Sequence, residues 1–169
     1  DADIEPLDDW ADYLYDIRQL ATLSGKAMSK KRNHVNRFCE ANPGWTLTPL
    51  GCEDLPDIIM FLEENPTGDK AGEGMAVYEH DECRRVLDHY SSYPFEGAVL
   101  RLVSGEIAAF AVGEVIADTL YVHIEKISHD VSGAGAAIGH FFARYMLERH
   151  PGLRYCNREE DCGDPGLRE

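Results

Sequence analysis

The chain has 169 residues, 44% of them hydrophobic and 28% charged, which suits one globular domain with a core of its own. Its 31 acidic residues outnumber its 16 basic ones, and the net charge of −15 argues against general nucleic-acid binding because the surface as a whole repels phosphates. No apolar run approaches the roughly 20 residues that span a bilayer, no signal peptide is visible, and five cysteines without a CxxC pair favour a reducing cytoplasm over a disulfide framework or a zinc site.

The N-terminal part of the chain predicts a strand and a helix. Residues 1–12 form an acidic segment. Residues 13–17 are rich in β-formers and predict a short strand. Ser24 and Gly25 then open a helix that runs to about Ala41, where an Asn-Pro-Gly sequence stops it.

This helix carries a positive island in an acidic chain. The window from Ile17 to Cys39 holds six basic residues and no acid, so its charge is +6 while the rest of the chain carries −21. On a helical wheel Lys31 falls on the apolar side, whereas four other polar residues form one stripe: Lys26, Lys30, Asn33 and Arg37. We expect this basic stripe to face an anion across a crevice, such as a phosphate, a carboxylate or an RNA backbone.

The remainder of the chain predicts a meander followed by a strand–helix–strand unit. A strand is expected over residues 45–50, two helices over 54–64 and 77–90, three strands over 97–103, 107–115 and 120–127, a helix from the Gly133-Ala134-Gly135 turn to His150, a strand over 153–157 and the start of another helix at 163–166. The short connections between the three consecutive strands require antiparallel pairing.

The helical crossover before the last strand favours parallel pairing of that strand. The predicted fold class is therefore α+β, with a mixed central sheet (antiparallel meander plus strand–helix–strand unit) flanked by helices. We expect the sheet to be splayed beside the N-terminus of the long helix. We also expect one domain over residues 13–169, truncated at its C-terminal end.

Four strings along the chain resemble a known family. They read LATLSGK at residues 20–26, KKRNHVNRF at 30–38, HIEK at 123–126 and NREEDCGDPGLR at 157–168. In this order they resemble the C-terminal domain family of phosphatidylglycerol lysyltransferases, and the order of elements resembles the GNAT acyltransferase superfamily. The resemblance implies a GNAT-like fold and the second of two tandem GNAT-like halves, so an upstream half is an expected partner.

The same resemblance implies a transferase that moves an aminoacyl group from a charged tRNA to an acceptor amine or hydroxyl. Aminoacyl-tRNA would be the donor substrate, and the acceptor would be a small molecule or a lipid headgroup, although the chain has no integral membrane segment. Two alternatives stay open. One is an N-acyltransferase that uses acetyl-CoA or another acyl-CoA, and the other is a non-catalytic half-domain used for pairing.

The basic helix is the first candidate site. Lys26, Lys30, Asn33 and Arg37 are candidates for binding the phosphates of a tRNA acceptor end or of coenzyme A. A solvated helix face paired with acidic neighbours is the alternative. Lys31 and His34 are sharper candidates, because a lysine turned toward the core needs a partner such as Glu125 or a substrate carboxylate.

The glycine turn before the long helix is the second candidate, because the N-terminus of a helix binds anions. In GNAT enzymes the matching loop reads Arg/Gln-x-x-Gly-x-Gly/Ala and cradles the pyrophosphate of acetyl-CoA, which makes Ser132, Gly133 and Gly135 the cofactor-binding candidates here. Asp130 stands where a base or amide belongs and would repel a pyrophosphate. The favoured alternative is that Ser132 or Asp130 caps the helix and that the glycines allow close packing.

His123 and Glu125 are the candidate catalytic pair. On a regular strand they share one face, about 6.7 Å apart, where they can position an acceptor nucleophile and take its proton. No Ser/His/Asp or Cys/His signature is present, so direct attack without a covalent intermediate is expected. The alternative is a polar strand face on which Glu125 pairs with Lys31 or Arg158.

Asn157 and Arg158 close the last strand, where ligand crevices of α/β sheets tend to lie. They are candidate contacts for a substrate amine or an acceptor stem, and Lys126 joins them from the HIEK string. A local ion-pair network is the alternative. The histidines show no paired metal spacing, so no metal site is predicted.

Overall fold

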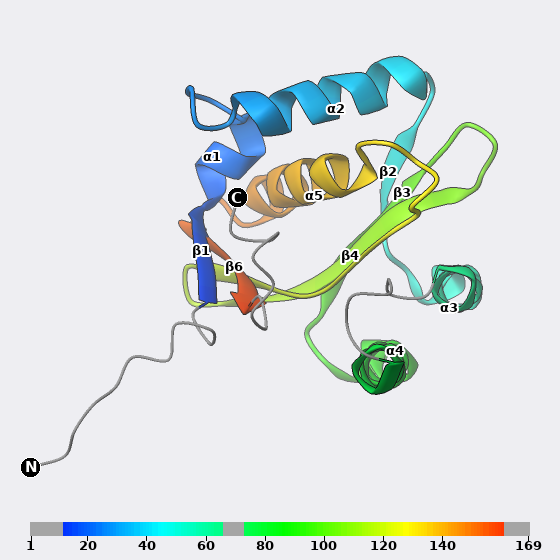
Figure 1. Ribbon diagram of the computed structural model, residues 1–169. Helices are drawn as coiled ribbons and strands as arrows, with labels where there is room; N and C mark the ends of the chain where they lie inside the picture. Colours follow the sequence, from blue (N-terminus) through cyan, green and yellow to red (C-terminus); the bar gives the residue numbers. More distant parts are fainter. Residues whose placement is uncertain (1–11, 66–72, 161–169) are drawn as a thin grey trace, which may run out of the picture.

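The computed structural model describes residues 12–65 and 73–160 (Figure 1). The helix predicted from residue 163 and nearly all of the acidic segment lie outside them. Within the described residues, no helix is both long enough and apolar enough to cross a membrane. The elements in chain order are β1 (Asp12–Asp16), α1 (Ile17–Thr22), α2 (Ser29–Ala41), β2 (Thr46–Pro49), η2 (Cys52–Asp54), α3 (Leu55–Glu64), α4 (Glu73–Asp88), η3 (Tyr90–Ser92), β3 (Glu96–Arg101), β4 (Ile107–Ile116), β5 (Thr119–Ile127), α5 (Ala134–Arg149) and β6 (Tyr155–Glu160).

The strands form one six-stranded mixed sheet in the order β1-β6-β5-β4-β3-β2. Strands β2 to β5 are antiparallel neighbours, β5 and β6 are parallel, and β6 pairs antiparallel with β1. The predicted meander and the parallel pairing of the last strand are therefore confirmed. The strand order also brings β1, from the start of the chain, beside β6, from its end.

Helices cover both faces of this sheet. Figure 1 shows α1, α2 and α5 on one face and α3 and α4 on the other. The apolar run of β4 supplies both cores, because successive side chains of a strand point to opposite faces. Ala109 and Ala111 pack in the core under α5, whereas Phe110 and Val112 pack in the core with α3 and α4.

The N-terminal region departs from the prediction. Ile17 is predicted in the strand but starts α1, because the Asp16 carboxylate accepts hydrogen bonds from the backbone N–H groups of Arg18 (2.8 Å) and Gln19 (3.2 Å) and so caps a helix. Leu23 ends this short helix with a φ of 50°. The basic helix, α2, therefore begins later than predicted.

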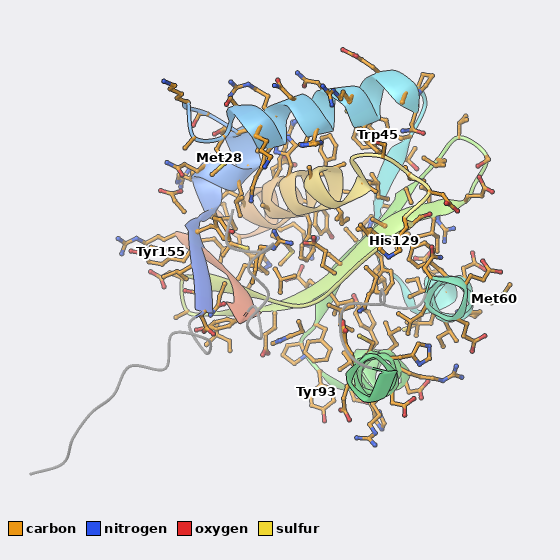
Figure 2. The ribbon with its side chains drawn as sticks, viewed as in Figure 1. Met28, Trp45, Met60, Tyr93, His129 and Tyr155 are labelled. Atoms are coloured by element: carbon orange, nitrogen blue, oxygen red, sulfur yellow. The ribbon has the colours of Figure 1, made fainter. Side chains whose placement is uncertain are left out.

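Apolar contacts at both ends of α2 fix which of its sides faces α5. Next to its C-terminal end, the Trp45 ring lies 4.3 Å from the Phe141 ring of α5 and 5.9 Å from the Phe38 ring, measured between centroids. At the other end, Met28 is buried with Leu23. Figure 2 labels Trp45 and Met28 at these two ends of the helix.

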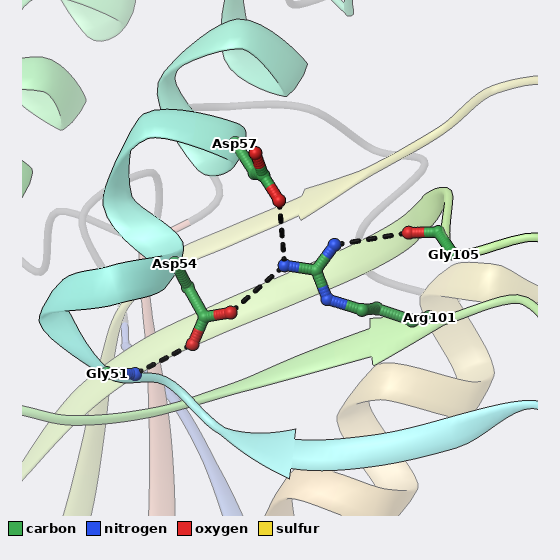
Figure 3. A network of polar contacts seen from close by, with 5 residues as sticks. All are labelled: Gly51, Asp54, Asp57, Arg101 and Gly105. Atoms are coloured by element: carbon green, nitrogen blue, oxygen red, sulfur yellow. Dashed lines mark hydrogen bonds and ion pairs between the residues drawn. The ribbon is translucent and has the colours of Figure 1, made fainter.

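A cluster of polar contacts ties α3 to the β3–β4 connection (Figure 3). The Arg101 guanidinium donates to Asp54 (3.0 Å), to Asp57 (3.3 Å) and to the Gly105 carbonyl (3.1 Å). Asp54 also accepts from the backbone N–H of Gly51 (2.9 Å). We call this group the Arg101 cluster; each of its three charged side chains has a partner of opposite sign.

Candidate functional site

Strands β5 and β6 separate after three paired positions. Their parallel pairing joins residues 119–121 to residues 155–157, and both strands then continue, β5 to Ile127 and β6 to Glu160. The predicted splay of the sheet is therefore confirmed. Side chains of α1, α2, α5, β5 and β6 surround a cavity of about 250 Å³ at this place, which is slightly below the usual size range of small-molecule sites.

Much of the cavity wall is apolar. Gly139 of α5 also lines it, and a Cβ placed there would lie 3.8 Å from Oε2 of Glu125. A larger residue at this position would fill space beside the carboxylate. The apolar side chains of the wall are Leu20, Leu23, Leu120, Val122, Ala136, Phe142 and Ala143.

Three charged residues from three elements reach the cavity: Lys31 of α2, Glu125 of β5 and Arg158 of β6. Nη2 of Arg158 donates to Oε1 of Glu125 at 2.6 Å. The Glu125 carboxylate raises the pKa of Arg158 above its ordinary value. Of the two partners that the sequence left open for Glu125, the structure therefore confirms Arg158.

Lys31 lies half-buried in the cavity wall, with its Nζ 4.7 Å from the centroid of the Tyr15 ring. Burial and then repulsion by Arg158 lower the pKa of Lys31, and attraction by Glu125 offsets only part of this effect. Among residues 12–65 and 73–160, no carboxylate lies within ion-pair distance of the Lys31 ammonium. The cavity thus contains a cation whose charge the described protein groups do not balance.

Cys156 and His140 complete the polar wall of the cavity. Burial raises the pKa of the Cys156 thiol to about 12, which keeps it protonated. Nδ1 of His140 lies 2.7 Å from the Leu20 carbonyl, to which it donates, and burial lowers the pKa of the imidazole. Both groups are uncharged near neutral pH, so the Cys156 thiol is a poor nucleophile in this wall.

The predicted placement of the catalytic pair on one strand face is wrong. The register between β4 and β5 shifts so that Val112 pairs with Ile124 while Gly113 pairs with Val122, which leaves His123 as an extra residue in β5. Such a bulge breaks the alternation of side chains along a strand. Glu125 therefore points to the cavity and His123 does not.

His123 lies on the face of the sheet covered by α3 and α4. Its Nε2 is 3.1 Å from the Glu114 carboxylate, and its ring packs edge-on against Phe95 with the centroids 5.6 Å apart. Phe95 belongs to the core of that face. A catalytic role for His123 or Glu125 stays a prediction, but the two side chains cannot act on one atom from these positions.

The basic stripe lies on the outer side of α2, with Lys26 in the bend before the helix, so its predicted orientation toward the crevice is wrong. All four of its residues, Lys26, Lys30, Asn33 and Arg37, are exposed and none of them lines the cavity. The reason is that Val35 and Phe38 hold the other side of the helix in the cores beside α5. Lys31, one residue and about 100° around the helix from Lys30, reaches the cavity instead.

The glycine turn before α5 serves packing. Gly133 is the N-cap with a φ of 81° and no side-chain cap, so the predicted capping by Ser132 or Asp130 is wrong. A Cβ on Gly133 would lie 2.7 Å from the carbonyl oxygen of His34 in α2, which confirms the predicted close packing. The α2 backbone therefore occupies space beside this turn, whereas Gly135 lines the cavity.

Comparison with known proteins decides the family. The model of the family described as phosphatidylglycerol lysyltransferase, C-terminal, matches residues 1–169, the whole chain. The chain belongs to this family. The resemblance noted in the four sequence strings is thereby confirmed.

Solved structures agree with this family assignment and with the GNAT-like fold. A conserved protein of unknown function from Bacteroides thetaiotaomicron is 34% identical with a TM-score of 0.84, over 95% of this chain and 54% of that protein. L-PGS from Bacillus licheniformis is 19% identical with a TM-score of 0.58, over 87% of this chain and 43% of that one. The PaiA N-acetyltransferase of Thermoplasma acidophilum, solved with coenzyme A, is 12% identical with a TM-score of 0.51, over 67% of this chain and 77% of that one.

The chain spans about half the length of the first two of these structures. No curated protein matches it. The predicted fold class, a mixed sheet flanked by helices with GNAT-like acetyltransferases among its neighbours, is confirmed.

Three other predicted substrate-binding residues of this family member, His34, Lys126 and Asn157, do not line the cavity. Lys126 pairs with Glu79 of α4, on the opposite face of the sheet. Asn157 donates from Nδ2 to the Asp12 carboxylate of β1 at 2.7 Å. The structure therefore gathers Lys31, Glu125, Gly135 and Arg158 out of the predicted site residues.

The sequence does not predict that Gly139, His140 and Cys156 line the cavity, or that Tyr15 contacts Lys31 beside it. Gly139 has a signal in the sequence, since a glycine inside an amphipathic helix costs stability and indicates a packing or functional reason. Tyr15 has none, because its contact with Lys31 depends on β1 lying next to β6.

Proposed function

We propose that this chain is a transferase domain that moves an aminoacyl group from a charged tRNA to an acceptor amine or hydroxyl in the cytoplasm. The observation that carries the proposal is the cavity at the splay of β5 and β6, where Lys31, Glu125 and Arg158 meet. Membership of the phosphatidylglycerol lysyltransferase C-terminal family supports the reaction class. The GNAT-like fold supports acyl transfer by direct attack.

The splayed strand supplies a place for the reacting ester. Beyond Tyr121, the described pairing of β5 with β6 ends, and we propose that this edge of β5 offers a backbone N–H group to a substrate carbonyl. Donors fixed in this way stabilise the oxyanion that develops during acyl transfer. The acceptor nitrogen or oxygen bonds to the ester carbonyl carbon, the ester C–O bond breaks, and the leaving ribose oxygen of the tRNA takes up the proton that the acceptor loses and becomes a hydroxyl.

The basic stripe supports the tRNA donor from the outer surface. Lys30 and Lys31 are adjacent in α2, so the stripe on the outer side of the helix starts close to the cavity wall. A tRNA backbone that follows the stripe can direct its acceptor end toward the cavity. Phosphate contacts of this kind lose affinity steeply with salt, because binding releases counterions.

Binding of aminoacyl-tRNA tests the proposal. The wild type should bind with an affinity that falls steeply between about 50 and 200 mM salt. The double variant Lys30→Glu/Arg37→Glu should bind at least about tenfold more weakly and with a smaller salt slope. The control Arg84→Glu/Arg85→Glu makes the same charge change on α4, on the other face of the sheet, and should bind like the wild type. The absence of binding, or equal affinities for all three proteins, would overturn the tRNA donor.

The two other functions make different predictions. Protection from thermal unfolding by coenzyme A would support an acyl-CoA N-acyltransferase, although the approach of α2 to Gly133 speaks against a pyrophosphate site there. Stable pairing with an upstream GNAT-like half, without any response to tRNA or coenzyme A, would support a non-catalytic half-domain. A lipid-headgroup acceptor would show as transfer to vesicle lipids.

A further inference from the structure

Resting on the proposed function, we infer that the cavity binds the acceptor, and that the acceptor is a free amino acid with a small apolar side chain, held as a zwitterion. Its carboxylate would lie against Lys31, its ammonium against Glu125, and its side chain on the apolar wall. This assignment differs from a lysyl group in the cavity and from a phosphate-bearing lipid headgroup.

The positive charge of Lys31 indicates that the ligand carries a carboxylate. Its half-buried ammonium has Arg158 as a neighbouring cation and no described carboxylate within ion-pair distance. A buried or half-buried charge without a counter-ion is costly, and an anion in the cavity removes that cost. Arg158 does not need this carboxylate as a partner, because it is already paired with Glu125.

The second carboxylate oxygen of Glu125, Oε2, indicates that the ligand carries an ammonium. Oε1 accepts from Arg158, whereas Oε2 lies beside Gly139 and receives no hydrogen bond from the described residues. Every fully buried polar side-chain atom among the described residues has a partner, so Oε2 must keep access to open space. An ammonium in the cavity can donate to this oxygen.

The apolar part of the cavity wall indicates the chemistry and the size of the ligand's side chain. Leu120, Val122 and Phe142 present apolar surface to a cavity of about 250 Å³, which suits one amino acid rather than a larger ligand. A lysine side chain would bring a second positive charge into a cavity that already holds Lys31 and Arg158. Repulsion between like charges therefore selects against it.

The chemistry balances for this acceptor. The bound ammonium loses one proton, for which Glu125 is the nearby carboxylate, and its neutral nitrogen attacks the ester carbonyl of the aminoacyl-tRNA. The new C–N bond forms, the ester C–O bond breaks, and the ribose hydroxyl leaves with the second amine proton. The products are an amide-linked dipeptide and deacylated tRNA.

Titration calorimetry on the full chain, without tRNA, tests the cavity with defined probes. L-leucine should bind, while L-leucinamide, which lacks the carboxylate, 4-methylpentanoate, which lacks the amine, and L-lysine should each bind at least about tenfold more weakly. sn-Glycerol 3-phosphate separates a phosphate-bearing headgroup from a carboxylate and should bind more weakly than leucine. Lysine or glycerol phosphate binding as well as leucine would overturn the inference.

Variants locate the binding. Lys31→Met keeps the length of the side chain and should weaken leucine binding at least about tenfold, and Gly139→Leu should abolish it by filling the space beside Oε2 of Glu125. Arg144→Met removes an exposed positive charge from the same helix as Gly139 and should bind leucine like the wild type. Wild-type affinity in both cavity variants, with native circular dichroism, would overturn the inference; Gly139→Leu still decides the matter if Lys31→Met fails to fold.

The inference and the proposed function can fail separately. The cavity variants should bind aminoacyl-tRNA like the wild type, because the basic stripe is unchanged in them. Normal tRNA binding without any leucine binding would reject the amino-acid acceptor and retain the tRNA donor. Leucine binding that depends on Lys31, together with no tRNA binding, would keep the cavity assignment and reject the donor.

Discussion

The cavity and the Arg101 cluster both contain an arginine paired with carboxylates, yet they differ in what remains unsatisfied. In the Arg101 cluster, two carboxylates and a backbone carbonyl surround one guanidinium, and Asp54 accepts a further backbone N–H. In the cavity, Arg158 donates a hydrogen bond to one oxygen of Glu125, while Lys31 has no described counter-ion. The first arrangement holds α3 to the sheet, and the second leaves groups for a ligand.

This difference shows how charge alone misleads. Both clusters border a cavity, and the cavity lined by Arg101 and Asp57 is the larger one at about 420 Å³. Every charged side chain of the Arg101 cluster has a partner of opposite sign, however, whereas Lys31 has no described counter-ion. Incomplete satisfaction beside open space is therefore the stronger indication of a binding site. Four substitutions test the comparison, from the largest expected effect to the smallest.

Arg158→Met should have the largest effect on stability. It leaves the Glu125 carboxylate, whose side chain is 16% exposed, without its partner, and breaking such a pair should lower the free energy of unfolding by about 2–3 kcal/mol. Urea unfolding measures this change. The control Arg84→Met breaks an exposed pair with Glu63 and should cost less than about 1 kcal/mol; equal losses in the two variants would contradict the burial argument.

Arg101→Met should destabilise the protein less and leave ligand binding intact. The side chains of Arg101 and Asp54 are 20% and 17% exposed, and Asp54 keeps its hydrogen bond from Gly51. We expect a loss of about 1–2 kcal/mol in the free energy of unfolding. Leucine titration should give the wild-type affinity, and a tenfold loss would show that the Arg101 cluster acts on the cavity.

Glu96→Gln extends the comparison to a third polar cluster, with an effect that depends on pH. Burial raises the pKa of the Glu96 carboxyl, but hydrogen bonds from Arg149 and His150 outweigh burial and leave the pKa below its ordinary value near 4.5. The ionised carboxylate therefore contributes stability that is present above pH 4.5 and is lost as the pH falls through the lowered pKa. The stability difference between the wild type and the variant should be smaller than that of Arg101→Met.

Unfolding measured from pH 7 down to pH 3 checks the direction of this effect. The difference between the two proteins should stay constant above about pH 5 and shrink in more acidic solution. A difference that grows as the pH falls would contradict a lowered pKa of Glu96.

Lys31→Met should have the smallest effect on the free energy of unfolding. It is the most direct test of the difference between the cavity and the Arg101 cluster. Burial and Arg158 lower the pKa of Lys31, so its ammonium costs stability at neutral pH, and its contact with the Tyr15 ring offsets part of that cost. We expect the free energy of unfolding to change by less than about 0.5 kcal/mol at pH 7. A loss above about 1 kcal/mol would show that Lys31 has a structural role like that of Arg101.

The pH dependence gives Lys31 a second test. Because its pKa is lowered in the folded state, the wild type should gain stability relative to Lys31→Met as the pH rises through the lowered pKa toward 10.5. Unfolding at pH 7 and pH 10 compares the two proteins. A relative loss at pH 10 would indicate a raised pKa instead.

Several parts of the fold could be predicted because their signals are local. The short connections around residues 104–106 and 117–118 require antiparallel pairing of β3, β4 and β5. The amphipathic pattern that ends at His150 predicts α5, and the crossover predicts a parallel β6. The sequence does not predict the short helix α1, because the Asp16 cap that starts it follows a run of β-formers.

The candidate site could be predicted only in part. Lys31 stands out in the sequence because it falls on the apolar side of its helix, away from the basic stripe, and it does reach the cavity. The predicted placement of His123 on the same face as Glu125 is wrong, because the bulge in β5 depends on the register with β4 and the sequence pattern of neither strand indicates it. The outward orientation of the stripe depends on packing against α5 from a distant part of the sequence.

The sequence by itself determined the order of most elements, the mixed sheet and the family, because periodicity, turns and motif strings are properties of neighbouring residues. Only the tertiary structure decided which charges meet. Lys31, Glu125 and Arg158 come from three elements far apart in the chain, and the strand order, the bulge at His123 and the docking of α2 on α5 together place them around one cavity. Pairing over such distances follows from packing of the whole domain, which no local pattern encodes.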